Sequence, residues 1–349
     1  MLRSLLGVRR VKKYLITTVK IGVSLAILGC LFWWSTRDKH SQEAMVELLR
    51  QPKRWDLLAG SVALCAAGVA LTLVRWCYLV RALGIALTMR DAMRIGWISY
   101  VFNFAPTGIL GGDVLKAVML AHERPGHRTE AAASVVVDRI VGLYLLFILG
   151  AVCIFPTGFW GENLENPKVH AFCVGVLGLT AVSTLGIVFV LLPGVLESRW
   201  LAALGRVRRI GPTIGRLVEA MRMYRRNAPV LMWSSVISVV LQLLFAASIW
   251  MVARGLNFDV PFAVFLAVYP VSGIVSTIPL PAGPFEIVFV FLIQAWVGRG
   301  QEAFVVAVAY RLVTMLITPI GLGYYLAGRR EVTEVIQEAE AEEGKEVGE

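Results

Sequence analysis

Long apolar runs alternate with short polar segments along almost the whole chain, a pattern typical of a polytopic membrane protein. A run of about 20 apolar residues is long enough to cross the hydrocarbon core of a bilayer as a single helix. Six such runs occupy residues 14–35, 57–80, 131–155, 168–193, 229–253 and 303–327. The sequence therefore predicts an all-α membrane protein with about six full transmembrane helices.

Two further apolar regions, 95–120 and 263–297, are interrupted by proline and glycine. Each region is too long for one span and too interrupted for two ordinary spans. Non-helical backbone at membrane depth is tolerated only where protein or a water-filled cavity satisfies its polar groups. We expect two re-entrant helical hairpins, each entering and leaving the membrane on one side, with paired full spans as the open alternative.

The two interrupted regions share a proline–glycine–acid motif. Its first copy runs from Pro106 to Asp113 and its second from Pro279 to Glu286. Each copy is followed, at nearly the same spacing, by an arginine inside an apolar run: Arg139 after the first and Arg311 after the second. Paired interrupted helices with charges near mid-membrane are typical of a transporter site.

This repetition also predicts how the chain is organised. One transmembrane domain should cover 1–330, with a first repeat at about 57–155 and a second at about 229–327. Residues 331–349 form an acidic tail without aromatic residues, which we expect to be cytoplasmic and either a short frayed helix or disordered.

Loop charges predict the orientation in the membrane. Basic residues gather in cytoplasmic loops, and segment 197–227 carries eight arginines. With this segment in the cytoplasm of a bacterial inner membrane, both termini are cytoplasmic and the two hairpins are inverted relative to each other. Segment 37–54 is then outside, although it carries five basic residues. Its apolar residues have helical spacing, so we expect an amphipathic helix on the outer surface.

Composition excludes several other classes of function. The chain has 349 residues, 57% of them hydrophobic and 17% charged, and a formal net charge of +10. The basic residues lie in short loops between apolar runs, where they attract anionic lipid headgroups, so we expect no nucleic-acid binding. The cysteines form no CxxC pair and the histidines lack ligand spacing. We therefore expect no metal site, no disulfide framework and no cofactor.

Arg139 and Arg311 are the most informative charged residues. An arginine at a helix centre costs roughly 2.5–3.5 kcal/mol, so its guanidinium needs a carboxylate, a carbonyl or a phosphate partner. One interpretation is that ion pairs form between Arg139 and Asp113 and between Arg311 and Glu286. The other is that both arginines hold the phosphate of an anionic headgroup, which matches the guanidinium fork. The two interpretations are compatible, because a phosphate can compete for the same arginine.

Neighbouring residues leave similar alternatives open. Asp113 and Glu286 serve as counter-ions, as proton-coupling sites or as caps of the returning half-helix. Lys116 either pairs with Asp113 or reaches the headgroup region. Arg75 is a second-rank candidate, because an arginine followed by Trp76 near a helix end favours snorkelling to the interface.

Two groups of candidate residues follow. The substrate-binding candidates are Arg139, Arg311, Asp113, Glu286, Lys116, Asp138, Tyr310, Arg75 and Asn103. The candidates that let the backbone break at the hairpin tips are Pro106, Gly108, Gly111, Gly112, Pro279, Pro281, Gly283 and Pro284.

Several motifs in order resemble a known family. They are Arg75-Trp76 with Gly84 downstream, Gly-Gly-Asp113 followed by Lys116, Asp138-Arg139, and Pro-Ala-Gly-Pro-Phe-Glu286. From about 14 to 330 the chain resembles the lysylphosphatidylglycerol synthase transmembrane (flippase-like domain) family, as a stand-alone member without the aminoacyl-transferase domain. The family is similar to the flippase half of bacterial multiple peptide resistance factors, which moves aminoacylated phosphatidylglycerol between leaflets. The resemblance implies lipid transport and no lysyl transfer.

The sequence thus predicts a non-enzymatic inner-membrane lipid translocase. Its cargo is an anionic or zwitterionic phospholipid or a lipid-linked precursor, and its partners are membrane lipids and a separately encoded lipid- or glycan-modifying enzyme. One alternative is an intramembrane transferase with a polyprenyl-phosphate-linked donor, which the scattered outer acids Glu162, Glu165 and Asp259 disfavour. The other is a lipid-binding scaffold that does not transport. The oligomeric state is not predicted.

Overall fold

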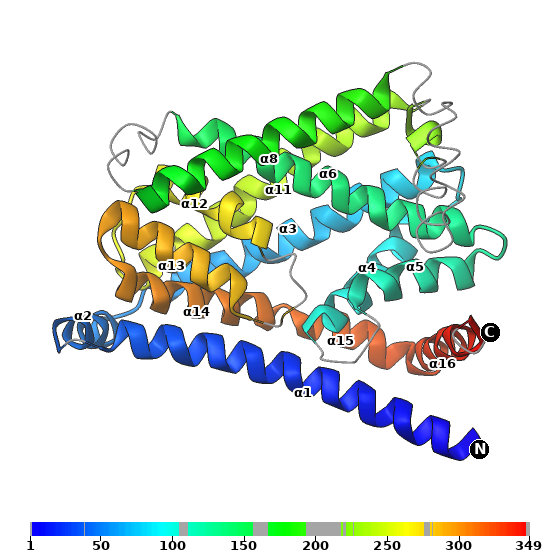
Figure 1. Ribbon diagram of the computed structural model, residues 1–349, viewed down its shortest axis with the longest axis horizontal. Helices are drawn as coiled ribbons and strands as arrows, with labels where there is room; N and C mark the ends of the chain where they lie inside the picture. The colour runs from blue at the N-terminus through cyan, green and yellow to red at the C-terminus, as the bar shows by residue number, and fades with distance from the viewer. Residues whose placement is uncertain are drawn as a thin grey trace.

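The computed structural model describes residues 2–37, 39–104, 111–155, 167–192, 218, 221–225, 227–275, 280 and 282–346. Within these ranges all regular structure is helical and no strand occurs, which confirms the all-α fold (Figure 1). The helices are α1 (Leu2–Ser35), α2 (Lys39–Arg50), α3 (Trp55–Ala82), α4 (Met89–Phe104), α5 (Gly112–Glu123), α6 (Arg128–Ile154), α8 (Pro167–Leu191), α11 (Ala228–Gly255), α12 (Phe262–Val275), α13 (Pro284–Val297), α14 (Gly300–Leu316), α15 (Thr318–Ala327) and α16 (Arg329–Glu346).

The described helices include four that are long and apolar enough to cross a membrane. They are Trp55–Ala82, Arg128–Ile154, Pro229–Gly255 and Gly300–Ala327. The other two expected spans fall on α1 and α8, whose described apolar parts, Thr18–Trp34 and Cys173–Phe189, are shorter. The span expected at 303–327 is interrupted, since α15 carries a proline in its first turn and that proline supplies no backbone N–H to the helix.

Helices α3 and α11 pack against each other over most of their length and run antiparallel. The Ser248 hydroxyl donates to the Ser61 carbonyl at 2.8 Å, while the Tyr224 hydroxyl donates to the Leu79 carbonyl at 2.9 Å. Residue numbers thus fall along α11 as they rise along α3. Between these contacts the helices approach closely, because a Cβ on Gly68 would lie 2.8 Å from the Phe245 ring.

The helices of the two interrupted regions are too short to cross the membrane alone. Helices α4 and α5 have 16 and 12 residues, and α12 and α13 have 14 each. At 1.5 Å per residue they are about 18–24 Å long, less than the hydrocarbon core of about 30 Å. These lengths agree with re-entrant hairpins.

The two hairpins begin at opposite ends of the α3–α11 pair. The end of α3 that leads into α4 lies beside the start of α11, where the Asn227 amide donates to the Ala82 carbonyl at 2.9 Å. The end of α11 that leads into α12 lies beside the start of α3, where the Arg54 N–H donates to the Gly255 carbonyl at 3.0 Å. This arrangement is the one that inverted hairpins need. The repeat boundaries and the single domain over 1–330 stay predictions.

Each half of the chain covers the hairpin of the other half. Helix α4 packs on α15 and α12 packs on α6. The Tyr100 hydroxyl donates to the Thr314 carbonyl at 3.0 Å, and a Cβ on Gly321 would lie 2.1 Å from the Trp97 carbonyl oxygen. On the other side, a Cβ on Gly150 would lie 3.3 Å from the Val271 side chain. The hairpins are therefore held between both halves.

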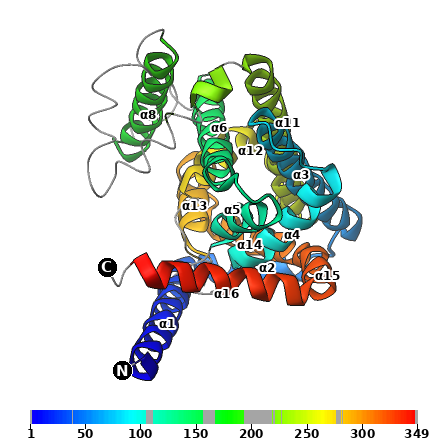
Figure 2. The same cartoon turned by 90° about the vertical axis from the view of Figure 1, so that its right-hand side faces the viewer.

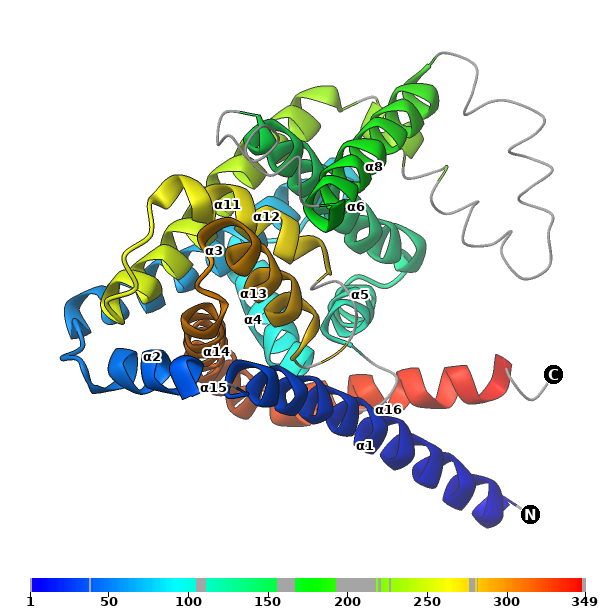
Figure 3. The same ribbon diagram turned by 60° about the vertical axis from the view of Figure 1, so that its left-hand side comes forward.

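Helices α1 and α2 are not part of this packing of each hairpin against the other half. They follow one edge of the bundle (Figure 3). Leu48 of α2 is buried and Met45 packs against the core, whereas Val46 and Leu49 are exposed. The amphipathic helix predicted for this segment is present, and its position on the outer surface stays a prediction. Helix α1 contacts the second hairpin through Ser24, whose Oγ accepts the Ala282 N–H at 3.4 Å.

The acidic tail is a helix over 329–346. Of the two expected forms, a short frayed helix or a disordered end, the structure thus shows a helix, and it is longer than expected. Helix α16 lies across the end of α5 (Figure 2). Val332 and Val335 are buried, and Arg94 bridges Glu331 at 2.8 Å and Glu123 at 2.5 Å. The sequence indicates this docking by two valines three residues apart, because that spacing places both side chains on one face of a helix.

Two adjacent glycines at the start of α5 give opposite predictions. A Cβ on Gly112 would lie 2.1 Å from the Ser99 carbonyl oxygen, which belongs to α4 backbone and cannot move aside. No atom of the described residues lies within 4 Å of a Cβ on Gly111. Gly112→Ser should therefore lower the unfolding free energy by about 1–3 kcal/mol, as overpacking does. The measurement is the thermal unfolding midpoint in detergent.

Gly111→Ser is the matched control. Gly111 is the N-cap of α5 with φ −71° and ψ 163°, a conformation in which serine is a favoured cap. We expect its midpoint to equal that of the wild type or exceed it. Equal midpoints for the two variants would contradict the close α4–α5 approach.

Candidate functional site

A cavity of about 330 Å³ lies where the long spans and both hairpins meet. It collects the predicted substrate-binding residues from both halves of the chain. Those lining it are Arg75, Asn103, Asp113, Lys116, Asp138, Arg139, Tyr310 and Arg311. Glu286, the remaining candidate, is fully buried behind Arg311. Residues more than 200 positions apart in the sequence thus share one site.

Both motif acids are paired with the arginines that follow them. The Arg139 Nε lies 2.5 Å from Asp113 Oδ2, and the Arg311 Nε lies 2.7 Å from Glu286 Oε1. The pairs differ in their access to the cavity. The Arg139 and Asp113 side chains are 49% and 33% exposed, whereas those of Arg311 and Glu286 are 22% and 1% exposed. The first pair is open and the second is enclosed.

Glu286 also caps its own helix. Its Oε2 accepts the Gly283 N–H at 2.7 Å, and Pro284 occupies the first turn of α13. Gly283 has φ +118°, a conformation that residues with a Cβ rarely adopt. Ion pairing and capping, which the sequence left as alternatives, therefore occur together at Glu286.

The first hairpin is built differently. Asp113 lies in the first turn of α5, but it makes no cap hydrogen bond with a residue that the structure describes, and the N-cap is Gly111, which has no side-chain contact. Of the remaining residues predicted at the hairpin tips, Pro106, Gly108, Pro279 and Pro281 lie outside the described residues.

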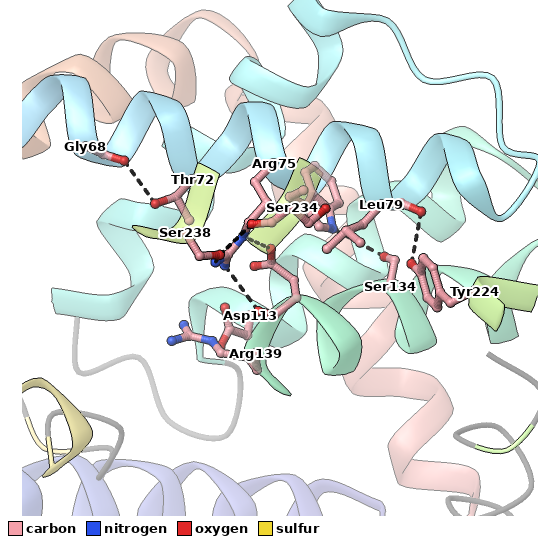
Figure 4. Close-up of polar contacts among 12 residues, drawn as sticks. Gly68, Thr72, Arg75, Leu79, Asp113, Ser134, Arg139, Tyr224, Ser234 and Ser238 are labelled. Carbon is pink, nitrogen blue, oxygen red and sulfur yellow. Dashed lines mark hydrogen bonds and ion pairs between the residues drawn. The ribbon is translucent and has the colours of Figure 1, made fainter. Parts of the chain in front are cut away.

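Arg75 does not snorkel, so that interpretation is wrong. Its side chain is 5% exposed, and its Nε donates to Asp138 Oδ1 at 2.9 Å. The Nη2 donates to the Asp138 carbonyl at 3.1 Å. The Nη1 donates to the Ser238 hydroxyl at 2.7 Å (Figure 4). Trp76 is fully buried and donates its indole N–H to the Ser134 hydroxyl at 3.3 Å. Arg75 thereby joins α3, α6 and α11.

Lys116 is the cation that remains without a counter-ion in contact. It is 6% exposed, and its Nζ lies 4.9 Å from the centre of the Trp76 ring. Among the described residues it has no ion pair or hydrogen bond, since Asp113 binds Arg139 and Asp138 binds Arg75. The pairing of Lys116 with Asp113 that the sequence allowed is not formed. The hairpin tips outside the described ranges, 105–110, 276–279 and 281, contain no charged residue.

Aromatic rings line the part of the cavity beside the second ion pair. The rings of Tyr269, Phe285 and Tyr310 lie with their centres 5.8–6.2 Å apart. Tyr310, predicted to bind substrate, is one wall of this cluster and is 6% exposed. The cavity thus combines charged side chains with an aromatic wall, as an amphipathic ligand needs.

Ser238 and Gln242 are two of the polar residues at the site that the sequence did not single out. Ser238 accepts the Arg75 hydrogen bond, and Gln242 lines the cavity one helical turn further along α11. Both lie in the apolar run 229–253. A polar side chain within a transmembrane run indicates an interior contact, and this signal was available at Gln242.

The Arg75–Asp138 pair generates a stability prediction. Arg75→Met leaves the Asp138 carboxylate buried without its partner, which should cost about 3–5 kcal/mol. The double variant Arg75→Met/Asp138→Leu removes both charges and should recover most of that loss. Thermal unfolding of wild type, both single variants and the double variant measures the coupling. A single variant that unfolds at the wild-type temperature would contradict the structural role of the pair.

The part of the chain that matches a known protein family contains the residues of the site. Neither the curated proteins nor the solved structures contain a match to the chain. The family model described as the lysylphosphatidylglycerol synthase TM region matches residues 21–321, a stretch that contains every charged residue of the cavity. Because this match covers most of the sequence, the chain belongs to the lysylphosphatidylglycerol synthase transmembrane family.

Proposed function

We propose that this multi-pass membrane protein translocates a lipid between the leaflets of a bacterial inner membrane, without catalysing a reaction. The cargo is an anionic or zwitterionic phospholipid or a lipid-linked precursor. The observation that carries the proposal is the excess of positive charge in the cavity, where Lys116 is buried without a carboxylate in contact. A phosphate at Lys116 would supply the missing counter-ion. Membership of a family named for the membrane region of a lipid synthase supports a lipid as the ligand.

The paired arginines have donors left for the same phosphate. A guanidinium has five N–H donors, and Arg139 uses its Nε for Asp113 while its side chain stays 49% exposed. It can therefore hold Asp113 and a phosphate oxygen together. Arg311 occupies the equivalent position in the other half, with its Nε on Glu286. We expect the headgroup to pass from one arginine to the other as the acids exchange partners.

The position of the hairpins supports movement between leaflets. They start at opposite ends of the α3–α11 pair, and residues of both hairpins line the cavity. A site reached from opposite sides through two inverted elements is the arrangement that alternating access uses. Cytoplasmic termini and a separately encoded lipid- or glycan-modifying enzyme as partner belong to the same proposal.

Lys116→Met should abolish most of the movement of an anionic lipid. A hydrogen bond to a charged group contributes about 1.5–3 kcal/mol, so we expect a loss of about tenfold or more. Lys116→Arg, which keeps the charge in a larger side chain, should retain part of the activity. The measurement is dithionite quenching of fluorescent phosphatidylglycerol in proteoliposomes. Lys20→Met on α1, outside the cavity, is the matched control.

Two results would contradict the proposal. Wild-type rates in folded Lys116→Met would show that the cavity does not carry the lipid. Absence of movement for every lipid offered, with lipid still retained in native mass spectrometry, would favour the scaffold that binds without transporting.

A further inference from the structure

Gln242 is an amide of α11 that faces the cavity without a partner among the described residues. It is 6% exposed, lines the cavity and forms no hydrogen bond with any residue that the structure describes. The amide is not one of the fully enclosed polar groups, so it opens onto the cavity. A ligand in the cavity can therefore hydrogen-bond both its oxygen and its N–H₂ group.

The position of Gln242 defines which part of a ligand it meets. Along α11, Ser238 lies one turn before it and accepts a hydrogen bond from Arg75. Phe245 lies about one turn after it, and its ring lies beside the Tyr269 ring with the centres 6.0 Å apart. The amide therefore lies between the buried Arg75–Asp138 pair and the aromatic rings, in the cavity that Lys116 also lines.

The charges around the cavity disfavour a cationic headgroup. Asp113, Asp138 and Glu286 are each bonded to an arginine. The charge of each of these carboxylates is thus already neutralised by an arginine, and a bound ammonium would also be repelled by Lys116. A hydroxyl group meets neither obstacle, because it donates to the amide oxygen and accepts from the amide N–H₂.

We propose that Gln242 determines headgroup specificity by hydrogen-bonding a hydroxyl of the lipid. The ligand class is an anionic phosphodiester lipid whose headgroup bears hydroxyl groups, as glycerol or a sugar-like polyol, and no ammonium. This inference rests on the proposed translocation and narrows its cargo. Lys116 binds the phosphate and Gln242 binds the uncharged polar part next to it.

The test compares headgroups in proteoliposomes. The fluorescent lipids are phosphatidylglycerol, phosphatidylinositol, phosphatidylethanolamine and phosphatidylpropanol, which is anionic but lacks the headgroup hydroxyls. Wild type should move a hydroxylated lipid about tenfold faster than phosphatidylpropanol, since a site built for a hydroxyl discriminates against its absence. Comparing the glycerol and inositol lipids shows which polyol fits the cavity.

Three variants examine the residue itself. Gln242→Leu should bring the ratio of phosphatidylglycerol to phosphatidylpropanol movement close to one. Gln242→Glu, nearly isosteric, adds the free carboxylate that the cavity lacks and should shift preference toward phosphatidylethanolamine. Gln42→Leu makes the same chemical change at an exposed glutamine outside the cavity and should keep the wild-type ratio. Thermal unfolding confirms that each variant is folded.

The outcomes separate the two proposals. Equal movement of phosphatidylglycerol and phosphatidylpropanol by wild type, or an unchanged ratio in Gln242→Leu, overturns the role of Gln242 and leaves translocation standing. Movement of no lipid overturns translocation instead. In that case retention of the same four lipids in native mass spectrometry tests the hydroxyl preference directly, and equal retention overturns it.

Discussion

The buried ion pair between Arg75 and Asp138 is the contact on which the rest of the site depends. Removing two charges from water costs several kcal/mol per ion, and the pair is tolerated only when its remaining donors and acceptors are satisfied. Arg75 meets this condition with the Asp138 carboxylate and carbonyl and with Ser238. These contacts connect two helices of the first half to the first long helix of the second. They thereby fix the register of the antiparallel α3–α11 pair, which in turn places the two hairpins at opposite ends.

Charge pairing then determines what the cavity can bind. Each carboxylate at the site is bonded to an arginine, so the carboxylates neutralise three cations and leave the Lys116 ammonium without a partner in contact. The site is also unequal in its two halves. Glu286 is enclosed and bonded to its own helix start, whereas Asp113 and Arg139 are open to the cavity. The repeated motif therefore forms one enclosed ion pair and one open ion pair. This asymmetry agrees with the proposed translocation, in which the protein would occupy one of two states.

Local sequence signals predicted part of this arrangement. Proline, glycine and an acid within a few residues predict a broken helix with a charged start, and a deep arginine predicts a partner, so both motif pairs were foreseeable. The burial of Arg75 was not, because it depends on α6 and α11, which follow α3 by dozens of residues and supply Asp138 and Ser238. The docking of α16 depends in the same way on distant apolar residues. Gln242 was overlooked because a single amide in an apolar run has no motif around it.

Lipid translocation as proposed requires that the excess cation of the cavity holds a lipid phosphate. The most direct measurement is an experimental structure of the protein in nanodiscs that contain phosphatidylglycerol. We predict density for a phosphate within hydrogen-bonding distance of the Lys116 ammonium, on the side that Arg139 also reaches. A cavity that holds only water or acyl chains under the same conditions, with Lys116 still against Trp76, would contradict it.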